Sequence, residues 1–253
     1  MKTLCGVDGC KGGWVATWQS ASGGDPQAAV FADFASLVLN LPPDAIIAVD
    51  MPIGLPDFVK GGGRGPEKAV RPLLKQRQSS VFSVPSRAAV YAQCEPLSGM
   101  EQMIAAHKRA SAIALATSDP PRKISIQAFN LFPKIREIDI FLRANPKAQS
   151  RIFESHPEFA FTILNGGEPM ALPKKTKGKA NPDGIAERRE FLASKGFDPD
   201  FLCQPVPRGA HADDFLDACV MMLIAGRFAN GEARPYPGRL TYDSFNLPIA
   251  IHA

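Results

Sequence analysis

The start of the chain constrains the fold most, because two apolar segments there flank one carboxylate and a cluster of glycines: LCGVDGCKGGWVATW, residues 4–18. Apolar residues alternate over 3–8, which predicts a β-strand that ends at Asp8. Residues 13–19 predict a second strand, and the turn GCKGG between the two predicts an antiparallel hairpin. The chain is therefore expected to build a sheet that begins with antiparallel pairing.

The remaining patterns alternate between strands and helices. The apolar run AIIAVD at 45–50 predicts a strand buried on both faces, as parallel strands usually are. Further strands are expected at 28–31 and 151–156, and helices at 33–41, 98–117, 126–144, 183–195 and 212–229. This order predicts an α/β fold, in which a mixed sheet with an antiparallel N-terminal region and parallel strands is flanked by helices.

The chain of 253 residues, 45% of them hydrophobic, is long enough for one sizeable core. We expect a single domain over residues 1–253, in which residues of about 51–150 form an inserted subregion rich in Arg, Pro and Gly and partly helical. Seven cations lie in the first part of that insertion: Lys60, Arg64, Lys68, Arg71, Lys75, Arg77 and Arg87.

Composition narrows the setting in which the protein works. The formal net charge of +4 permits a polyanionic partner without requiring one. No apolar run reaches the roughly 18 residues of a membrane span, and the strand pattern begins without a signal-peptide core, so we expect no membrane association and a cytoplasmic location. The five scattered cysteines are expected to be reduced thiols. The sequence leaves the oligomeric state open.

Carboxylates recur at the ends of predicted strands and at the start of the last helix. Asp8 and Asp50 each close a strand, and Glu154 lies in or just after the strand at 151–156. Asp214 and Asp217, three residues apart, can face the same way from the last helix. Because sites in α/β sheets gather at the carboxyl ends of the strands, these side chains are expected to converge.

A cluster of carboxylates is tolerated when a hard divalent cation neutralises it, and bound Mg²⁺ or Mn²⁺ then serves phosphate chemistry. We therefore predict a metal site at the five acids, with Asp8, Asp50, Glu154 and Asp214 catalytic and Asp217 as a further ligand. The glycine turn after Asp8 would let a phosphate backbone approach closely. Each acid alone could instead make a turn or cap a helix.

Polar and basic residues supply candidates for substrate binding. Arginine offers a planar fork for phosphate oxygens, and serine adds neutral donors. A second basic patch at Lys174, Lys175 and Lys177 could cover the site, or be a solvated loop. The candidates for substrate binding are Lys11, Arg71, Arg77, Ser79, Ser80, Arg87, His156, Glu158 and Lys175. A solvated loop for the arginines and structural hydrogen bonding for His156 remain open.

Seven motifs in order resemble one family over nearly the whole chain, the family called domain of unknown function 429. They read GVDGCKGGW, IAVDMPIGLPD, RQSSVFSVPSR, IQAFNLFPKIREID, FESHPEFAF, KKTKGK with Arg188 or Arg189 downstream, and DDFLDACVMMLIA. The resemblance implies an RNase H-like fold and a nuclease activity that is itself inferred from acidic residues. Related enzymes carry acids on the first strand, the fourth strand and the last helix, which places Asp8, Asp50 and Asp214 in those roles.

The leading hypothesis is a metal-dependent phosphodiester hydrolase, nuclease-like, acting on nucleic acid or on a small phosphoester. The material inserted after Asp50 could close the site, which favours a small phosphorylated ligand or the end of a nucleic acid. One alternative is a non-catalytic RNase H-like protein that binds nucleic acid or phosphate. A relative of the actin-like ATPases and sugar kinases is a weaker alternative, because the sequence has no second glycine hairpin for a nucleotide-binding half.

Overall fold

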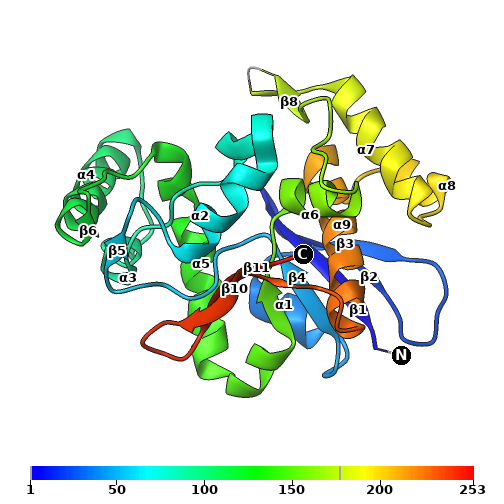
Figure 1. The fold of residues 1–253 in the computed structure, drawn as a ribbon, viewed down its shortest axis with the longest axis horizontal. Coiled ribbons are helices and arrows are strands. Elements are labelled where there is room, and N and C mark those ends of the chain that lie inside the picture. Colours follow the sequence, from blue (N-terminus) through cyan, green and yellow to red (C-terminus); the bar gives the residue numbers. More distant parts are fainter. Residues whose placement is uncertain (1, 177) are drawn as a thin grey trace.

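The computed structural model describes residues 2–176 and 178–253. Its centre is a five-stranded sheet in the order β3-β2-β1-β4-β7 (Figure 1). The first three strands pair antiparallel, whereas β1 pairs with β4, and β4 with β7, in parallel. The strands are β1 Leu4–Cys10, β2 Gly13–Gln19, β3 Gln27–Phe31, β4 Ile46–Val49 and β7 Ile152–Glu154. The prediction of an α/β fold with an RNase H-like mixed sheet is confirmed.

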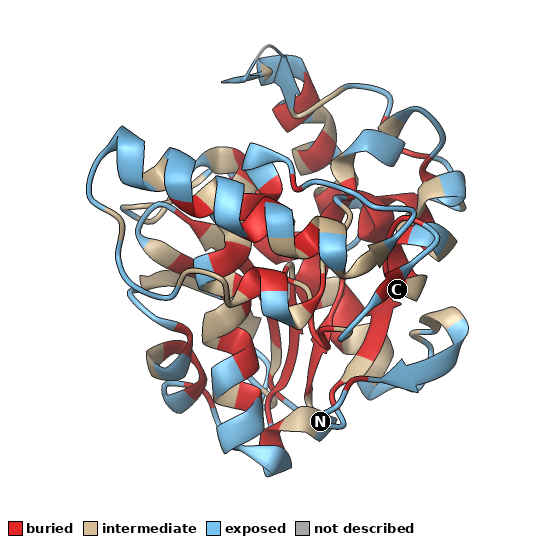
Figure 2. Ribbon diagram, turned by 90° about the vertical axis from the view of Figure 1, so that its left-hand side faces the viewer, coloured by how far each residue is buried: buried red, intermediate tan, exposed pale blue. Residues whose placement is uncertain are grey.

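Helices cover both faces of this sheet, so its central strands are buried on each side (Figure 2). In β4, Ile47 and Val49 join the core on one face, and Ile46 and Ala48 join the core on the other. This two-sided burial explains the continuous apolar run in the sequence. On one face, α1 Phe34–Leu39 and α5 Ile126–Ala144 share the core with the sheet, and α4 Met100–Ala116 extends that core outward. On the other face, α9 Ala212–Ala229 lies directly on the strands, and α6 Pro157–Leu164, α7 Pro182–Ser194 and α8 Pro199–Cys203 complete the second core around α9.

The long helix α9 lies directly against β1, and a glycine makes this possible. A Cβ atom at Gly6 would stand 2.0 Å from the carbonyl oxygen of Ala218 and 2.2 Å from the backbone nitrogen of Met222. No side chain fits there unless the helix moves away. Because α9 packs so closely on β1, the acids in its first two turns lie near Asp8, close to the end of the strand.

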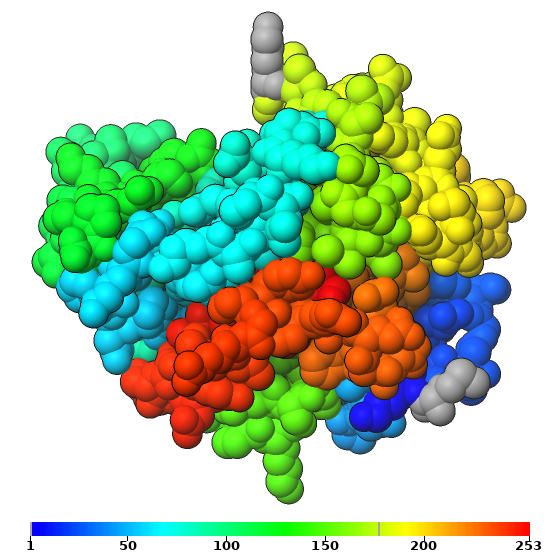
Figure 3. Space-filling view, viewed as in Figure 1, coloured from blue at the N-terminus to red at the C-terminus, as the bar shows by residue number. Residues whose placement is uncertain are grey.

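The segment between β4 and β7 forms the part of the molecule coloured cyan to green in Figures 1 and 3. Helix α5 packs against the sheet, and the division into one domain with an inserted subregion stays a prediction. The elements of this segment are β5 Val59–Lys60, α2 Gly65–Val70, η1 Arg71–Ser80, α3 Arg87–Val90, α4, β6 Ser118–Asp119, α5 and η2 Pro146–Ser150. The 3₁₀ segment η1 is kinked at Lys75, whose φ is +47°.

Two hairpins were not expected from the sequence. The basic segment after residue 173 forms the short pair β8 Lys175–Thr176 and β9 Lys179–Ala180, with Lys177 outside the described residues. The chain ends in β10 Pro235–Tyr242 and β11 Pro248–His252, and the hydroxyl of Ser155 donates to the carbonyl of His252 at 2.7 Å. Across the described ranges, no helix is both long and apolar enough to pass through a membrane.

Candidate functional site

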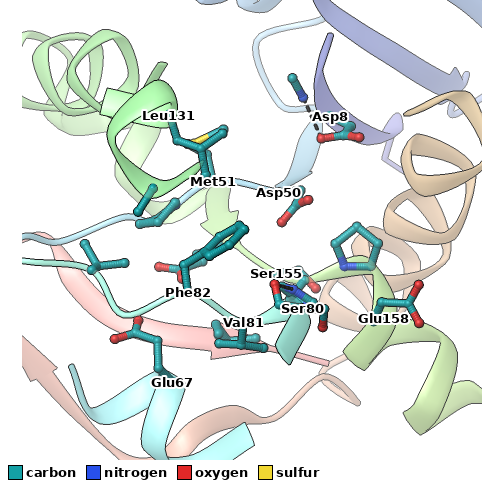
Figure 4. Close-up of a pocket in the computed structure, with 18 of the residues that line it drawn as sticks. Asp8, Asp50, Met51, Glu67, Ser80, Val81, Phe82, Leu131, Ser155 and Glu158 are labelled. Carbon is teal, nitrogen blue, oxygen red and sulfur yellow. Dashed lines mark hydrogen bonds between the residues drawn. The ribbon is translucent and has the colours of Figure 1, made fainter. Parts of the chain in front are cut away.

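A cavity of about 530 Å³ opens where β1 and β4 end, and α5, α6, α9 and the segment 76–85 enclose it. Asp8, Asp50 and Glu158 lie along one side of it, and Phe82 and Leu131 lie on the other (Figure 4). Its position at the carboxyl ends of the strands is where α/β sheets place their sites. Its size lies within the roughly 300–1,000 Å³ of pockets that bind small molecules.

Asp8, Asp50 and Glu158 line this cavity from three separate elements, and Asp217 lies buried outside the lining, where it interacts electrostatically with Asp50 and Glu158. Asp8 lies inside β1, two residues before the strand ends at Cys10, so the prediction that the strand ends at Asp8 is wrong. The Gly9 N–H donates to Oδ1 of Asp8 at 2.6 Å. Asp50 directly follows β4, Glu158 lies in the first turn of α6, and Asp217 lies about one turn into α9. The strand register and the seat of α9 thus bring together acids that stand more than 200 residues apart in the sequence.

Burial and mutual repulsion raise the pKa values of these acids. Burial raises the pKa of Asp8 well above its ordinary value, and the charges of Asp50 and Asp217 raise it further. Burial raises the pKa of Asp50 to about 6 and that of Asp217 to about 7, although Lys174 lowers both. The carboxylates therefore share one electrostatic environment in which their negative charges are not fully compensated.

Lys174 supplies the positive charge at the centre of this group. Its Nζ forms an ion pair with Oδ2 of Asp217, and the neighbouring Lys175 pairs with Asp213 at 2.5 Å. Burial lowers the pKa of Lys174, but Asp217 and Asp8 outweigh that effect and raise it above its ordinary value, so the amine stays charged. Sequence reasoning had named Lys174 only as part of a surface patch.

The chemistry of the acids fits a hard divalent cation. Within residues 2–176 and 178–253, Oδ1 of Asp217 and Oε2 of Glu158 are buried without a hydrogen-bond partner. Hard oxygen ligands of this kind are what Mg²⁺ and Mn²⁺ prefer. In that same part of the chain, no three His, Cys, Asp or Glu side chains stand close enough to hold an ion as they are. Lys174 lies among the carboxylates instead.

The two predicted acids of α9 differ in their surroundings. Oδ2 of Asp214 accepts the His211 N–H at 2.9 Å, so Asp214 helps to cap the helix. Asp214 still lines the cavity, and burial raises its pKa. Asp217 is more deeply buried and carries the ion pair with Lys174. The geometry therefore favours Asp217 over Asp214 as the main acid of this helix.

Glu154, expected to bind metal, is held in a buried ion network. Its Oε2 accepts the Ile53 N–H at 2.7 Å, and its Oε1 accepts from Arg64 at 2.6 Å. Arg64 also binds Glu67 at 2.7 Å. Burial raises the pKa of Glu154 to about 7 against the opposing effect of Arg64. With both oxygens bonded, Glu154 anchors the chain after β4, and Glu158 takes its place in the cluster.

The predicted basic residues separate into those that line the cavity and those that do not. Arg77 lines it but donates to the carbonyls of Met170 and Ala171, the latter at 2.7 Å. Lys175, Ser79 and Ser80 also line the cavity. Three described candidates lie outside its lining: Lys11, Arg71 and Arg87. Lys11 is exposed at the hairpin turn, and its expected contact with substrate has no geometric support.

Arg71 and Arg87 bind other parts of the protein. Arg71 donates to the carbonyl of Val81 at 3.2 Å and to the hydroxyl of Ser83 at 2.8 Å. Arg87 forms ion pairs with Asp139 and Asp243, at 2.5 Å each. Both arginines therefore position the chain around the cavity, where the sequence had suggested contact with phosphate.

His156 and Glu158 both face the cavity but have partners in the protein. Nδ1 of His156 accepts the Phe159 N–H at 3.3 Å and so caps α6, while Nε2 lies 3.3 Å from the carbonyl of Ser80. Burial lowers the pKa of His156, which keeps the ring neutral. Oε1 of Glu158 accepts from the fully buried Arg188 at 2.6 Å. His156 is thus structural, and Glu158 keeps one oxygen free.

Lys134 is a site residue that the sequence reasoning missed. It comes from α5, donates to the Gly13 carbonyl and stands 4.5 Å from the centre of the Trp14 ring. Burial lowers its pKa, while Glu137, Cys10 and Asp8 act in the opposite direction. The only signal was its place in the quoted segment IQAFNLFPKIREID, because a lysine in a helix gives no chemical indication by itself.

Two glycines of the turn after Asp8 serve packing, while Gly9 lines the cavity, and the approach of a phosphate backbone there stays a prediction. The Gly12 N–H donates to the Gly209 carbonyl at 2.8 Å, and a Cβ at Gly12 would meet the Gly209 Cα at 3.0 Å. A Cβ at Gly13, whose φ is +122°, would meet the Phe31 carbonyl at 2.2 Å. The turn packs on the loop before α9 and on β3.

Comparison with known proteins gives the family and no activity. A family model described as protein of unknown function (DUF429) matches residues 6–241. The chain belongs to this family, which confirms the resemblance of its motifs. No curated protein and no solved structure matches the chain.

Proposed function

From the site of this family member we propose a metal-dependent phosphodiester hydrolase, nuclease-like, that acts on nucleic acid or on a small phosphoester. Asp8, Asp50, Glu158 and Asp217 would hold the metal, with Asp214 at the rim. Mg²⁺ or Mn²⁺ bound there would supply an activated water and neutralise charge on the phosphate. The five free cysteines agree with work in a reducing compartment, for which we propose the cytoplasm.

The observation that carries this proposal is the charge balance at the end of β1. Asp217 pairs with Lys174 and Glu158 with Arg188, whereas Asp8 and Asp50 form no ion pair with Lys or Arg within residues 2–176 and 178–253. Buried charges are costly unless they are paired, so a site of this composition lowers stability unless further positive charge is bound. A divalent cation supplies that charge and agrees with the unpartnered oxygens of Asp217 and Glu158.

The chain's own residues would position the substrate. Lys175, Ser79 and Ser80 line the cavity and can donate to phosphate oxygens. Lys174 can bind a phosphate oxygen if a metal takes its place beside Asp217. Lys134, which lies outside the cavity lining, adds a positive charge near Asp8.

Cleavage of a substrate panel tests the proposal. Single- and double-stranded DNA, RNA, an RNA–DNA hybrid, a branched junction and a chromogenic phosphodiester are each incubated with Mg²⁺, Mn²⁺ or EDTA. We expect metal-dependent cleavage of at least one substrate and loss of at least about 100-fold in Asp8→Asn, which keeps the side-chain shape. The matched control is Asp25→Asn at an exposed position, with no change expected. Full activity in Asp8→Asn would refute the metal assignment.

The ion pair of Lys174 with Asp217 favours a second candidate, a non-catalytic protein that binds nucleic acid or phosphate. A lysine in the centre of the acids partly neutralises them without a metal. This candidate predicts binding of polyanions and no turnover on the same panel. Mn²⁺ binding that is lost in Asp8→Asn together with cleavage would exclude it.

A further inference from the structure

The cavity has an apolar wall that the hydrolysis of a phosphodiester does not use. Its side chains are Met51, Phe82, Val84, Leu131, Phe132 and Ile135. Figure 4 shows Met51, Phe82 and Leu131 across the cavity from Asp8 and Glu158. Phe82 is 39% exposed although the wall continues into the buried core. An exposed aromatic ring beside a charged site is a natural contact for a planar group.

We propose that this wall binds the base of one nucleotide, either free or at the end of a single strand, while its phosphate lies at the carboxylates. The inference rests on the proposed function for the place of the phosphate. An apolar surface opposite a polar one matches a molecule with a flat aromatic part at one end and a phosphate at the other. Base stacking on an aromatic side chain tolerates any base, because each base has a π-face.

Phe82 is held as a fixed platform by residues of the motif RQSSVFSVPSR. Arg71 donates to the carbonyl of Val81 and to the hydroxyl of Ser83, the residues on either side of Phe82. The hydroxyl of Ser83 in turn donates to the carbonyl of Gly62 at 2.8 Å. These bonds on both sides hold the backbone at Phe82 in place before a ligand arrives, which lowers the entropy cost of binding. This gives Arg71 a positioning role.

The size of the cavity decides between one nucleotide and a duplex. A volume of about 530 Å³ suits a ligand of nucleotide size. In a duplex the faces of the bases are stacked on one another, so a base reaches Phe82 only from a single strand or after leaving the stack. Ser80 adds a buried hydroxyl that has no hydrogen-bond partner in the described residues, and it can bond a polar atom of the nucleotide.

Equilibrium binding tests this without any turnover. Adenosine 5′-monophosphate and ribose 5-phosphate are titrated into the protein by calorimetry, with and without Mn²⁺. We expect adenosine monophosphate to bind more tightly than ribose 5-phosphate, and Phe82→Ala to weaken it about tenfold without changing the affinity for ribose 5-phosphate. Phe82→Trp should keep the affinity. Phe58→Ala, at an exposed phenylalanine outside the cavity lining, is the matched control.

Further outcomes distinguish a base at a strand end from a free nucleotide, and distinguish failure of the base site from failure of the proposed hydrolase. A short single-stranded oligonucleotide that displaces adenosine monophosphate, with the same dependence on Phe82, identifies a strand end; displacement only by mononucleotides identifies a free nucleotide. Equal affinity for the two phosphates, or no effect of Phe82→Ala, overturns the base site. If the base site fails this test but the chromogenic phosphodiester is still cleaved, the proposed hydrolase activity remains supported without a base site. Base-dependent binding without any cleavage leaves the base site and refutes the hydrolase.

Discussion

Replacing Asp50 with Asn is expected to stabilise the metal-free protein at neutral pH. Burial and the charges of Glu158 and Asp214 raise the pKa of Asp50 from its ordinary 3.8 to about 6. The folded state therefore binds this proton more tightly than the unfolded state does. Ionising Asp50 costs folding free energy, and asparagine has the same shape without the charge.

The size of the effect follows from the pKa difference. A difference of about 2 between folded and unfolded states, at 1.36 kcal/mol for each pKa unit, corresponds to about 3 kcal/mol at any pH above 6. Because the pKa is raised, wild-type stability falls as the pH rises from about 4 to about 6. Below pH 4 the carboxyl is neutral in both states, so Asp50→Asn and the wild type should be equally stable there.

Urea unfolding in EDTA, followed by the fluorescence of the sheet residues Trp14 and Trp18, measures this difference at each pH between 4 and 8. We expect Asp50→Asn to gain about 3 kcal/mol at pH 8, or roughly 6–12 °C in Tm for a chain of this length. Adding Mn²⁺ should stabilise the wild type by mass action and the variant much less. Asp25→Asn, at an exposed carboxylate, is the control.

Two results would contradict the reasoning. A stability difference that does not change between pH 4 and pH 8 would show that charge on Asp50 is not what the substitution removes. A variant less stable than the wild type at pH 8 in EDTA would show that the carboxylate is favourably bonded in the folded protein.

Two substitutions outside the carboxylate cluster test the packing and the ion pairs that position it. Gly6→Ala should destabilise the fold by more than the usual 1–3 kcal/mol of overpacking, because the new methyl meets the backbone of α9; urea unfolding measures this, and a loss below 1 kcal/mol would mean that α9 is free to move. Arg64→Met should cost about 3–5 kcal/mol at pH 8, since it leaves Glu67 and Glu154 buried without a positively charged partner. That loss should shrink toward pH 5, where Glu154, with its pKa raised to about 7, becomes protonated.

The sheet was predictable because its signals are local. Period-two alternation, a glycine turn and a short apolar run place β1, β2 and β4 within a few residues. They put Asp50 directly after β4, and Asp8 two residues before the true end of β1. The C-terminal hairpin was not predicted, since Pro235 and Pro237 in β10 argue against a strand in the sequence. Prolines are tolerated there because this two-stranded sheet leaves them on an edge.

The partners of charged residues could not be predicted, because they come from distant parts of the chain. Arg87 binds Asp139 and Asp243, which lie 52 and 156 residues away in the sequence. Glu154 binds Arg64 across 90 residues. A sequence shows that such side chains are present, but only the fold decides whether a charge faces a ligand or another charge.

This division of charges also explains how the protein tolerates its site. The acids that pair with buried arginines, such as Glu154 with Arg64, have their charge compensated within the protein. In the part of the chain that the structure describes, neither Asp8, near the end of β1, nor Asp50, directly after β4, forms an ion pair with an arginine, and burial raises the pKa of both. The folded protein is therefore less stable because of the charges at this edge of the sheet. Proteins keep such unfavourable features where function requires them. The pair Asp8 and Asp50, which Lys174 compensates only in part, is therefore a stronger argument for the proposed cation than the number of acids.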